Sequence, residues 1–256
     1  MHNGEQSPSG TPGARTLTYE GASTIGTNIM PEAAKLFAAR TGVVFSFIGG
    51  AGADAGFKAA MEGKATFGGV ARELTAAEKV QAGGQVVIGF DVMGVFVHGA
   101  NPVKALTRSQ LKEIFTGRAT NWKQFQGPDR PIKVYSEKLT GGRATVKAFK
   151  DMVLGAEPYG PLREFDDATD CLHEVAADPG GISASSMSFA VAGVAALSID
   201  GAAPTRGAVQ SGAYPLKRPL VLVTKEIPAG DSKAFLEFML TPEAQAIVAR
   251  KFVPAK

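Results

Sequence analysis

The sequence contains one cysteine, Cys171, and three histidines among its 256 residues. A single cysteine cannot form an internal disulfide, and neither His98 nor His173 has a second side chain at the spacing of a metal site. We therefore expect neither a metal nor a cofactor. The lack of disulfides leaves the cellular compartment open, because many exported proteins also have none.

The sequence also lacks long apolar runs and a strong charge imbalance. No run approaches the roughly 18–20 residues that a membrane-spanning helix needs. The formal net charge is +3, so the total charge indicates neither nucleic-acid binding nor a membrane-surface patch. A chain of this length that is 45% hydrophobic and 20% charged is typical of a globular protein with one large or two modest domains.

Residues 1–15 are polar and rich in Gly, Pro and Ser. They contain no apolar centre of the kind that a signal peptide needs, so we expect a flexible leader. A remnant of processing, a tether that follows a lipid anchor and an artificial end are all compatible with this composition.

Beyond the leader, strand-like and helix-like patterns alternate. Strand patterns occupy 16–21, 43–50, 86–99, 132–136, 180–200 and 214–224. Helical spacing is found at 30–38, with 24–28 as its cap, and at 55–61, 75–81, 107–117, 144–149 and 231–252, where the last run is interrupted at Thr241-Pro242. This alternation predicts an α/β fold with parallel sheets flanked by helices.

Three predicted loops, 22–25, 49–56 and 140–143, place glycine or hydroxyl residues just before a helix. Open α/β sheets bind ligands beyond the carboxyl ends of their strands, beside helix N-termini. Helix starts carry unpaired N–H groups and a partial positive charge, so they bind anions without a cationic surface. One such loop alone is more often a cap or turn, but three in one chain favour an anion site. Side chains that could add donors are Ser23, Thr24, Arg72, Thr140 and Arg143.

Four stretches of the chain resemble the phosphate-binding family of ABC-transporter solute-binding proteins. They lie at 19–74, 106–125, 134–149 and 178–190, and the segment LKEIFTG followed by NW (111–122) is the most specific of them. The family implies a periplasmic-binding-protein type II fold, in which two α/β lobes are joined by two crossover strands with a ligand cleft between them. Lobe I would comprise 17–95 and 184–256, and lobe II would comprise 96–183.

The resemblance also implies ligand donors. Thr24 matches a hydroxyl of the family's first loop, and Ile25 matches its backbone N–H donor. Thr140 and Gly141 match the hydroxyl and amide donors of the second lobe. Arg143 follows that motif, as in many relatives.

The chain departs from the family at four positions. Ala53 stands where a serine commonly donates, Ala71 where a carboxylate or serine is usual, and Gly142 where a threonine is usual. Ser136 replaces the arginine that pairs with phosphate in some members. Ala71 cannot accept the proton of a protonated phosphate, and these losses make the cleft wider and less polar. Carboxylates that could replace the missing acceptor are Asp54, Glu73 and Glu137.

Enzyme functions have weaker support in the sequence. His98 ends an apolar strand and is interpreted as a crossover or capping residue. Cys171 lies in an apolar helical context that is typical of a buried side chain rather than a nucleophile. The acidic run 165–171 is typical of a helix start or an exposed face.

We therefore predict a non-enzymatic solute-binding protein, acting as a monomer in the periplasm or another extracytoplasmic space. Its ligand would be phosphate or a related oxyanion, and its partner an inner-membrane ABC permease. Two alternatives stay open. The same fold could bind a larger organic or lipidic ligand, because family contacts are lost at Ala53, Ala71 and Gly142, or it could serve as an extracytoplasmic sensor or adhesion module.

Overall fold

The computed structural model describes residues 15–140 and 144–256. Residues 1–14, which hold nearly all of the predicted leader, and Gly141, Gly142 and Arg143 of the predicted site lie outside the described residues. Two compact units make up the chain. Unit 1 comprises Met1–Val70, Ala76–Val86 and Leu222–Thr241, and unit 2 comprises Ala71–Thr75, Val87–Val221 and Pro242–Lys256. The lobe limits expected from the resemblance differ from the limits of these two units. The division into those lobes stays a prediction.

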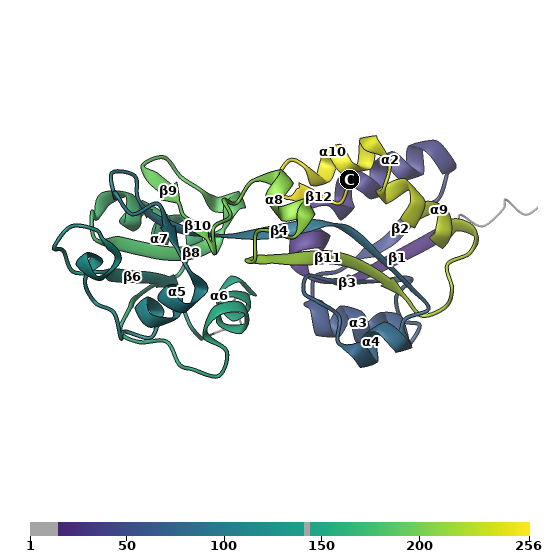
Figure 1. The fold of residues 1–256 in the computed structure, drawn as a ribbon. Helices are drawn as coiled ribbons and strands as arrows, with labels where there is room; N and C mark the ends of the chain where they lie inside the picture. The colour runs from purple at the N-terminus through teal and green to yellow at the C-terminus, as the bar shows by residue number, and fades with distance from the viewer. Residues whose placement is uncertain (1–14, 141–143) are drawn as a thin grey trace, which may run out of the picture. The chain divides into compact units, whose positions relative to one another are not determined.

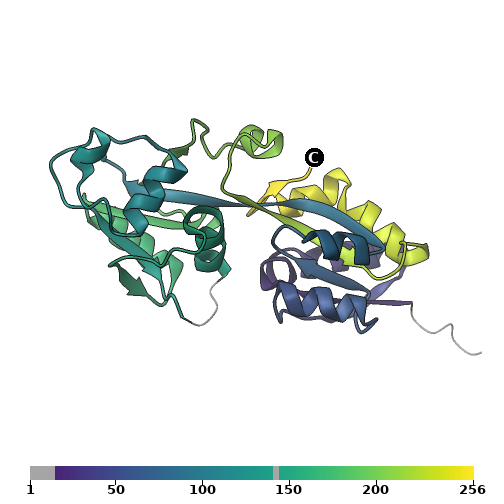
Figure 2. The same ribbon diagram turned by 60° about the horizontal axis from the view of Figure 1, so that its bottom comes forward.

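Unit 1 is built on a parallel sheet. Strand β1 (Thr16–Gly21) pairs in parallel with β2 (Val44–Ile48) and with β3 (Phe67–Val70). Helices α3 (Ala53–Met61) and α4 (Ala76–Gln81) cover one face, and α2 (Met30–Thr41) and α9 (Gly230–Met239) cover the other (Figures 1 and 2). The short helix α1 (Ser23–Asn28) follows β1 directly. A parallel sheet flanked by helices is what the alternating pattern predicts.

Aromatic side chains hold the α2 and α9 face of unit 1 together. The Phe235 ring lies 5.1 Å from Phe37, 4.8 Å from Phe45 and 5.2 Å from Phe67, measured between ring centroids. Such pairs add about 0.5–1.5 kcal/mol each beyond the burial of their area. They fix α2 and α9 on the sheet, so the carboxyl edge of β1 and β2 is carried by a rigid support.

Unit 2 contains a mixed sheet. Strand β6 (Lys133–Glu137) runs parallel to β7 (Arg163–Phe165) and β8 (Gly181–Ser186), while β4 (Gly84–His98) is antiparallel to β8 and to β9 (Val194–Ala196). Its helices are α5 (Arg108–Phe115), α6 (Ala144–Phe149), α7 (Ala168–Ala177), α8 (Arg206–Ser211) and α10 (Pro242–Val248). Shorter elements are β5 (Ala105–Leu106), β10 (Ser198–Ile199), β12 (Val253–Pro254), 3₁₀ turns at Trp122–Phe125 and Met187–Phe189, and a π turn at Lys150–Leu154.

Helix α5 confirms the helix predicted at 107–117. Thr107 accepts a hydrogen bond from the Gln110 N–H, and the Gln110 side chain accepts one from the Thr107 N–H, which is a complete capping box. Trp122 is fully buried and its indole N–H donates to the Gly180 carbonyl at 3.0 Å. Phe125 is half-buried and packs against the same cluster, so both aromatic residues contribute to the core of unit 2.

Two strands contribute residues to both units. They are β4 and β11 (Lys217–Thr224), and the hydrogen-bonded order of strands is β2-β1-β3-β11-β4-β8-β6-β7. Within unit 2, Asp91 of β4 pairs with the Arg218 guanidinium at 2.7 Å and accepts a hydrogen bond from the Ser186 hydroxyl at 2.7 Å. Asp91 is 3% exposed and the Arg218 side chain is 12% exposed, so a charge in the middle of an apolar strand is neutralised by a largely buried partner.

No helix within the described ranges is long and apolar enough to cross a membrane.

Candidate functional site

Two of the three predicted loops meet at the carboxyl edge of the unit 1 sheet. Because β1 and β2 are parallel, the starts of α1 and α3 lie at one edge. A Cβ on Gly56 would lie 2.3 Å from the Gly21 Cα, and one on Gly26 would lie 2.6 Å from the Gly49 oxygen. Any larger residue would therefore separate the two segments. The glycines serve close packing of the two helix starts.

The start of α1 presents backbone donors. The N–H groups of Ile25 and Gly26 both donate to the Ala22 carbonyl at 3.0 Å. The N–H groups of Ser23 and Thr24 precede these bonds and have no acceptor within the helix. The Ser23 side chain is exposed and the Thr24 side chain is half-buried. At this turn the amides of Ser23 and Thr24 are the available donors, since the Ile25 amide that the resemblance implies is already paired.

The side chain of the buried Tyr19 contacts the same turn. The Tyr19 hydroxyl donates to the Ala22 carbonyl at 2.9 Å. Burial, followed by the nearby charge of Glu20, raises the pKa of Tyr19 above its ordinary value. The hydroxyl therefore keeps its proton and remains a donor to the start of α1.

The start of α3 presents a second set of donors. Its first internal bond runs from the Gly56 N–H to the Gly52 carbonyl at 2.9 Å, so the N–H groups of 53–55 precede it. Ala53 is half-buried at the first position of the helix, and Asp54 is exposed in its first turn. Helix α3 has nine residues, and its dipole favours an anion at this end.

Glu20 also belongs to this region, although the sequence patterns did not single it out. Its Oε1 accepts hydrogen bonds from the Gly21 N–H and the Ala51 N–H, both at 2.9 Å. The available signal was a carboxylate near the end of a predicted strand, directly before the glycine that precedes a candidate ligand loop. Its partner Ala51 lies 31 residues away in the chain, which no local pattern reveals.

Two predicted site residues follow β3. Ala71 is 7% exposed and offers no acceptor. The Arg72 guanidinium donates to the Glu73 carbonyl at 3.0 Å, and its side chain is half-buried. Arg72 is therefore engaged in its own turn.

The third predicted loop follows β6 in unit 2. Ser136 is 6% exposed within β6, and Thr140 is exposed after it. Lys138 in this turn pairs with Asp166 at 2.6 Å. Helix α6 begins at Ala144, which gives the expected order of strand, loop and helix. The predicted residues thus divide between Ser23, Thr24, Ile25, Ala53 and Asp54 in unit 1 and Ala71, Arg72, Ser136 and Thr140 in unit 2.

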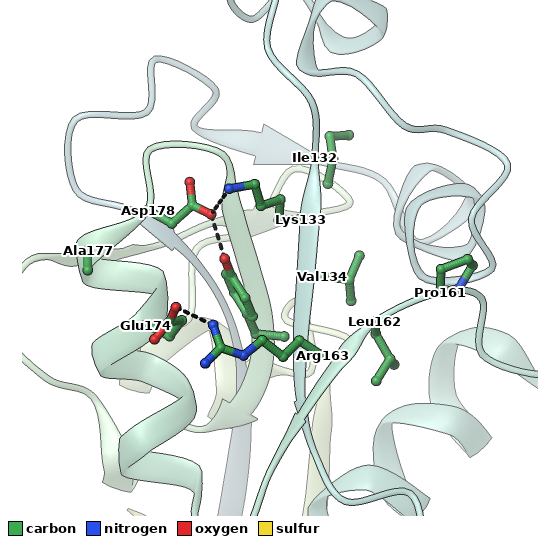
Figure 3. A pocket seen from close by; sticks show the side chains of 10 residues that line it. Ile132, Lys133, Val134, Pro161, Leu162, Arg163, Glu174, Ala177 and Asp178 are labelled. Carbon is green, nitrogen blue, oxygen red and sulfur yellow. Dashed lines mark hydrogen bonds and ion pairs between the residues drawn. The ribbon is translucent and has the colours of Figure 1, made fainter.

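Unit 2 also has a surface pocket of about 640 Å³ beside β6 and β7 (Figure 3). Asp178 accepts a hydrogen bond from the Tyr135 hydroxyl at 2.5 Å and pairs with Lys133 at 3.0 Å, and Arg163 pairs with Glu174 at 2.7 Å. Each charge in the pocket has an opposite partner. The pocket therefore offers an anion no net electrostatic attraction. None of the predicted site residues lines this pocket.

The interpretations of Cys171 and His98 are confirmed. Cys171 is 2% exposed, with its sulfur 3.1 Å from the Ser183 hydroxyl. Burial raises the pKa of its thiol to about 11, which is the behaviour of a packed side chain. The His98 Nδ1 accepts a hydrogen bond from the Ala100 N–H at 3.1 Å and closes a turn. Among residues 15–140 and 144–256, no group of three His, Cys, Asp or Glu side chains is placed to hold a metal.

Comparison with known proteins gives consistent matches. The PBP superfamily domain matches residues 6–243. The phosphate-binding protein PstS of Bacillus subtilis is 30% identical over 250 residues, which cover 94% of this chain and 79% of the relative.

Solved structures agree along nearly the whole chain. A Clostridium perfringens structure, described as a phosphate ABC transporter substrate-binding protein with bound phosphate, shares 32% identity and a TM-score of 0.71, covering 94% of this chain and 100% of that chain. PstS of Borrelia burgdorferi has a TM-score of 0.83 at 20% identity, covering 94% and 99% of the two chains. The second match supports the fold alone.

These findings confirm the type II periplasmic binding fold and a binding protein rather than an enzyme. The chain belongs to the PBP superfamily, within the PstS-like family of solute-binding proteins.

Proposed function

We propose that this chain binds phosphate or a related oxyanion as the extracytoplasmic solute-binding protein of an ABC transporter. The observation that carries this proposal is the pair of helix starts in unit 1. The first amides of α1 and α3 lie at one sheet edge, ahead of the first internal bond of each helix. Both the Bacillus subtilis relative and the phosphate-bound Clostridium perfringens structure support phosphate as the first ligand to test.

The proposed chemistry uses neutral donors. The N–H groups of Ser23 and Thr24 would point to the anion together with the Thr24 hydroxyl, and the first turn of α3 would add further N–H groups. Each hydrogen bond to a charged ligand contributes about 1.5–3 kcal/mol. A few such bonds give useful affinity without a cationic surface, which fits a chain whose net charge is only +3.

Unit 2 is proposed to add the Thr140 hydroxyl and the amides that follow it. Ligand binding would then shift an equilibrium between open and closed forms. We further propose that the protein acts as a monomer in the periplasm or another extracytoplasmic space and delivers its ligand to an inner-membrane permease.

The proposal is tested by calorimetric titration of phosphate into the whole chain and into two threonine variants. We expect saturable binding to the unmodified chain. Thr24→Val removes a hydroxyl donor and should weaken phosphate binding by about tenfold or more. Thr27→Val is the matched control, because Thr27 is an exposed residue on the same short helix, and it should bind phosphate as the unmodified chain does.

Sulfate and a panel of organic anions are titrated in parallel. If millimolar phosphate gives no heat while an organic anion binds, the phosphate assignment is wrong and the larger-ligand alternative replaces it. Equal affinity in the Thr24→Val variant and its control would move the anion site away from α1.

A further inference from the structure

We infer that Glu20 is a positioning residue of the proposed anion site, because its carboxylate sets the spacing between the starts of α1 and α3. This inference rests on the proposed function. Glu20 is the last residue but one of β1, and its side chain is half-buried beside the two loops that carry the candidate donors.

One carboxylate oxygen of Glu20 joins the segments that precede α1 and α3. Glu20 Oε1 accepts the Gly21 N–H and the Ala51 N–H at 2.9 Å each. Gly21 immediately precedes Ala22, the N-cap of α1, and Ala51 immediately precedes Gly52, the N-cap of α3. A backbone bond from the Gly52 N–H to the Gly21 carbonyl at 2.9 Å ties the same segments. The carboxylate and this backbone bond together fix one helix start against the other.

Glycine at position 49 makes room for this carboxylate. A Cβ on Gly49 would lie 2.4 Å from Oε2 and 2.6 Å from Oε1 of Glu20. Gly49 lies outside the left-handed region, so alanine is compatible with its backbone. A methyl group at position 49 would displace the Glu20 carboxylate, because this is the flexible end of a side chain. The backbone conformation of the loop would not need to change.

A negative charge next to an anion site is unfavourable by itself. The presence of the Glu20 carboxylate beside the starts of α1 and α3 is explained by its role as a hydrogen-bond acceptor. Without it, two backbone N–H groups lose their partner and the loop before α3 is held by fewer bonds. The amides of Ser23, Thr24 and Ala53 would then be less well oriented before the ligand arrives. If Glu20 acts as an acceptor, Glu20→Ala should weaken phosphate binding and Glu20→Gln should not. If only its charge mattered, both variants should bind phosphate more tightly.

The test compares phosphate affinity in the whole chain by calorimetry. Glu20→Ala should weaken phosphate binding by about tenfold, because the loop before α3 loses its anchor. Glu20→Gln keeps a carbonyl oxygen that accepts both amides and removes the charge, so its affinity should equal or exceed that of the unmodified chain. Glu62→Ala is the control, since Glu62 lies at the far end of α3 and pairs with Lys64; it should not change affinity.

Gly49→Ala gives an independent variant. In the unmodified background it should weaken phosphate binding by about as much as Glu20→Ala, because both remove the carboxylate from its place. In the Glu20→Ala background the methyl group has space, so Gly49→Ala should add little further loss. This double-mutant cycle measures a coupling that general destabilisation would not produce. Because the displaced carboxylate is a flexible group, Gly49→Ala also carries the test if Glu20→Ala fails to fold.

The outcomes separate this inference from the proposed function. If the unmodified chain does not bind phosphate, the proposed function and the inference both fail. If the unmodified chain binds phosphate and the Glu20→Ala or Gly49→Ala variants bind it equally well, only the positioning role is overturned. Equal losses in Glu20→Ala and Glu20→Gln would also overturn it, because the acceptor would then have no separate effect.

Discussion

At the scale of single residues, the glycine-rich loop has a different first role from the one its composition indicates. We expected this loop, 49–56, to contribute to an anion site at a helix start. In the structure Gly56 and Gly26 are needed because the segments that lead into α1 and α3 touch each other. The N–H groups of Gly49, Gly52 and Gly56 all donate to carbonyls within unit 1. The candidate donors are therefore the first amides of the helices and not those of Gly49, Gly52 and Gly56.

A second residue-scale feature is the buried ion pair of Asp91 and Arg218, whose side chains are 4% and 12% exposed. Arg218→Met would leave the Asp91 charge without its partner. We expect a loss of about 3–5 kcal/mol in the free energy of unfolding, measured by urea denaturation.

The control for this prediction is Arg108→Met, which breaks an ion pair with Asp200 whose side chains are 52% and 32% exposed. Exposed pairs contribute about 0–1 kcal/mol. A loss in Arg218→Met no larger than in Arg108→Met would show that the Asp91 charge does not depend on its buried partner.

At the scale of elements, helices with a strong local signal were predicted well. The capping box at Thr107 sets the start of α5, and Pro242 separates α9 from α10 as expected. The segment after β1 was predicted less well. Its hydroxyl residues were expected to cap one helix, but they form α1, and α2 begins separately at Met30. Helix α1 is six residues long. Its start accepts a local hydrogen bond from the Tyr19 hydroxyl, and its Gly26 packs against the Gly49 carbonyl. The second contact joins distant positions, which local spacing does not record.

Strand β6 and helix α7 are joined by a charged contact with a predictable pH dependence. Partial burial opposes the charge of Asp178, but hydrogen bonds from the Tyr135 hydroxyl and the Gly180 N–H and the Lys133 ion pair outweigh it. The pKa of Asp178 therefore lies below its ordinary value. A carboxyl group with a lowered pKa in the folded state stabilises the protein above its unfolded pKa, and this contribution is lost as the pH falls through the folded value.

Asp178→Asn should therefore reduce the free energy of unfolding at pH 7, and the difference from the unmodified chain should shrink below about pH 4. Urea denaturation at pH 7 and at about pH 3 measures both values. A difference that stays constant across this range would mean that the Asp178 charge does not contribute to the stability of unit 2.

At the scale of the whole molecule, the fold was predictable further than the site. The order of strands, helices and family-like segments along the chain was sufficient for the type II fold. The site depends on contacts between distant positions, as between Glu20 and Ala51, and on single replacements such as Ala71, whose effect depends on what surrounds them. The roles of Thr140, Gly141, Gly142 and Arg143 in ligand binding remain predictions.

The proposed oxyanion ligand would be held by the first amides of α1 and α3. Backbone amide resonances of the whole chain, recorded during a phosphate titration, report on these amides individually. We expect the amides of Ser23, Thr24 and Ala53 to shift the most and to saturate together. Saturable phosphate binding that leaves these three amides unmoved would contradict it.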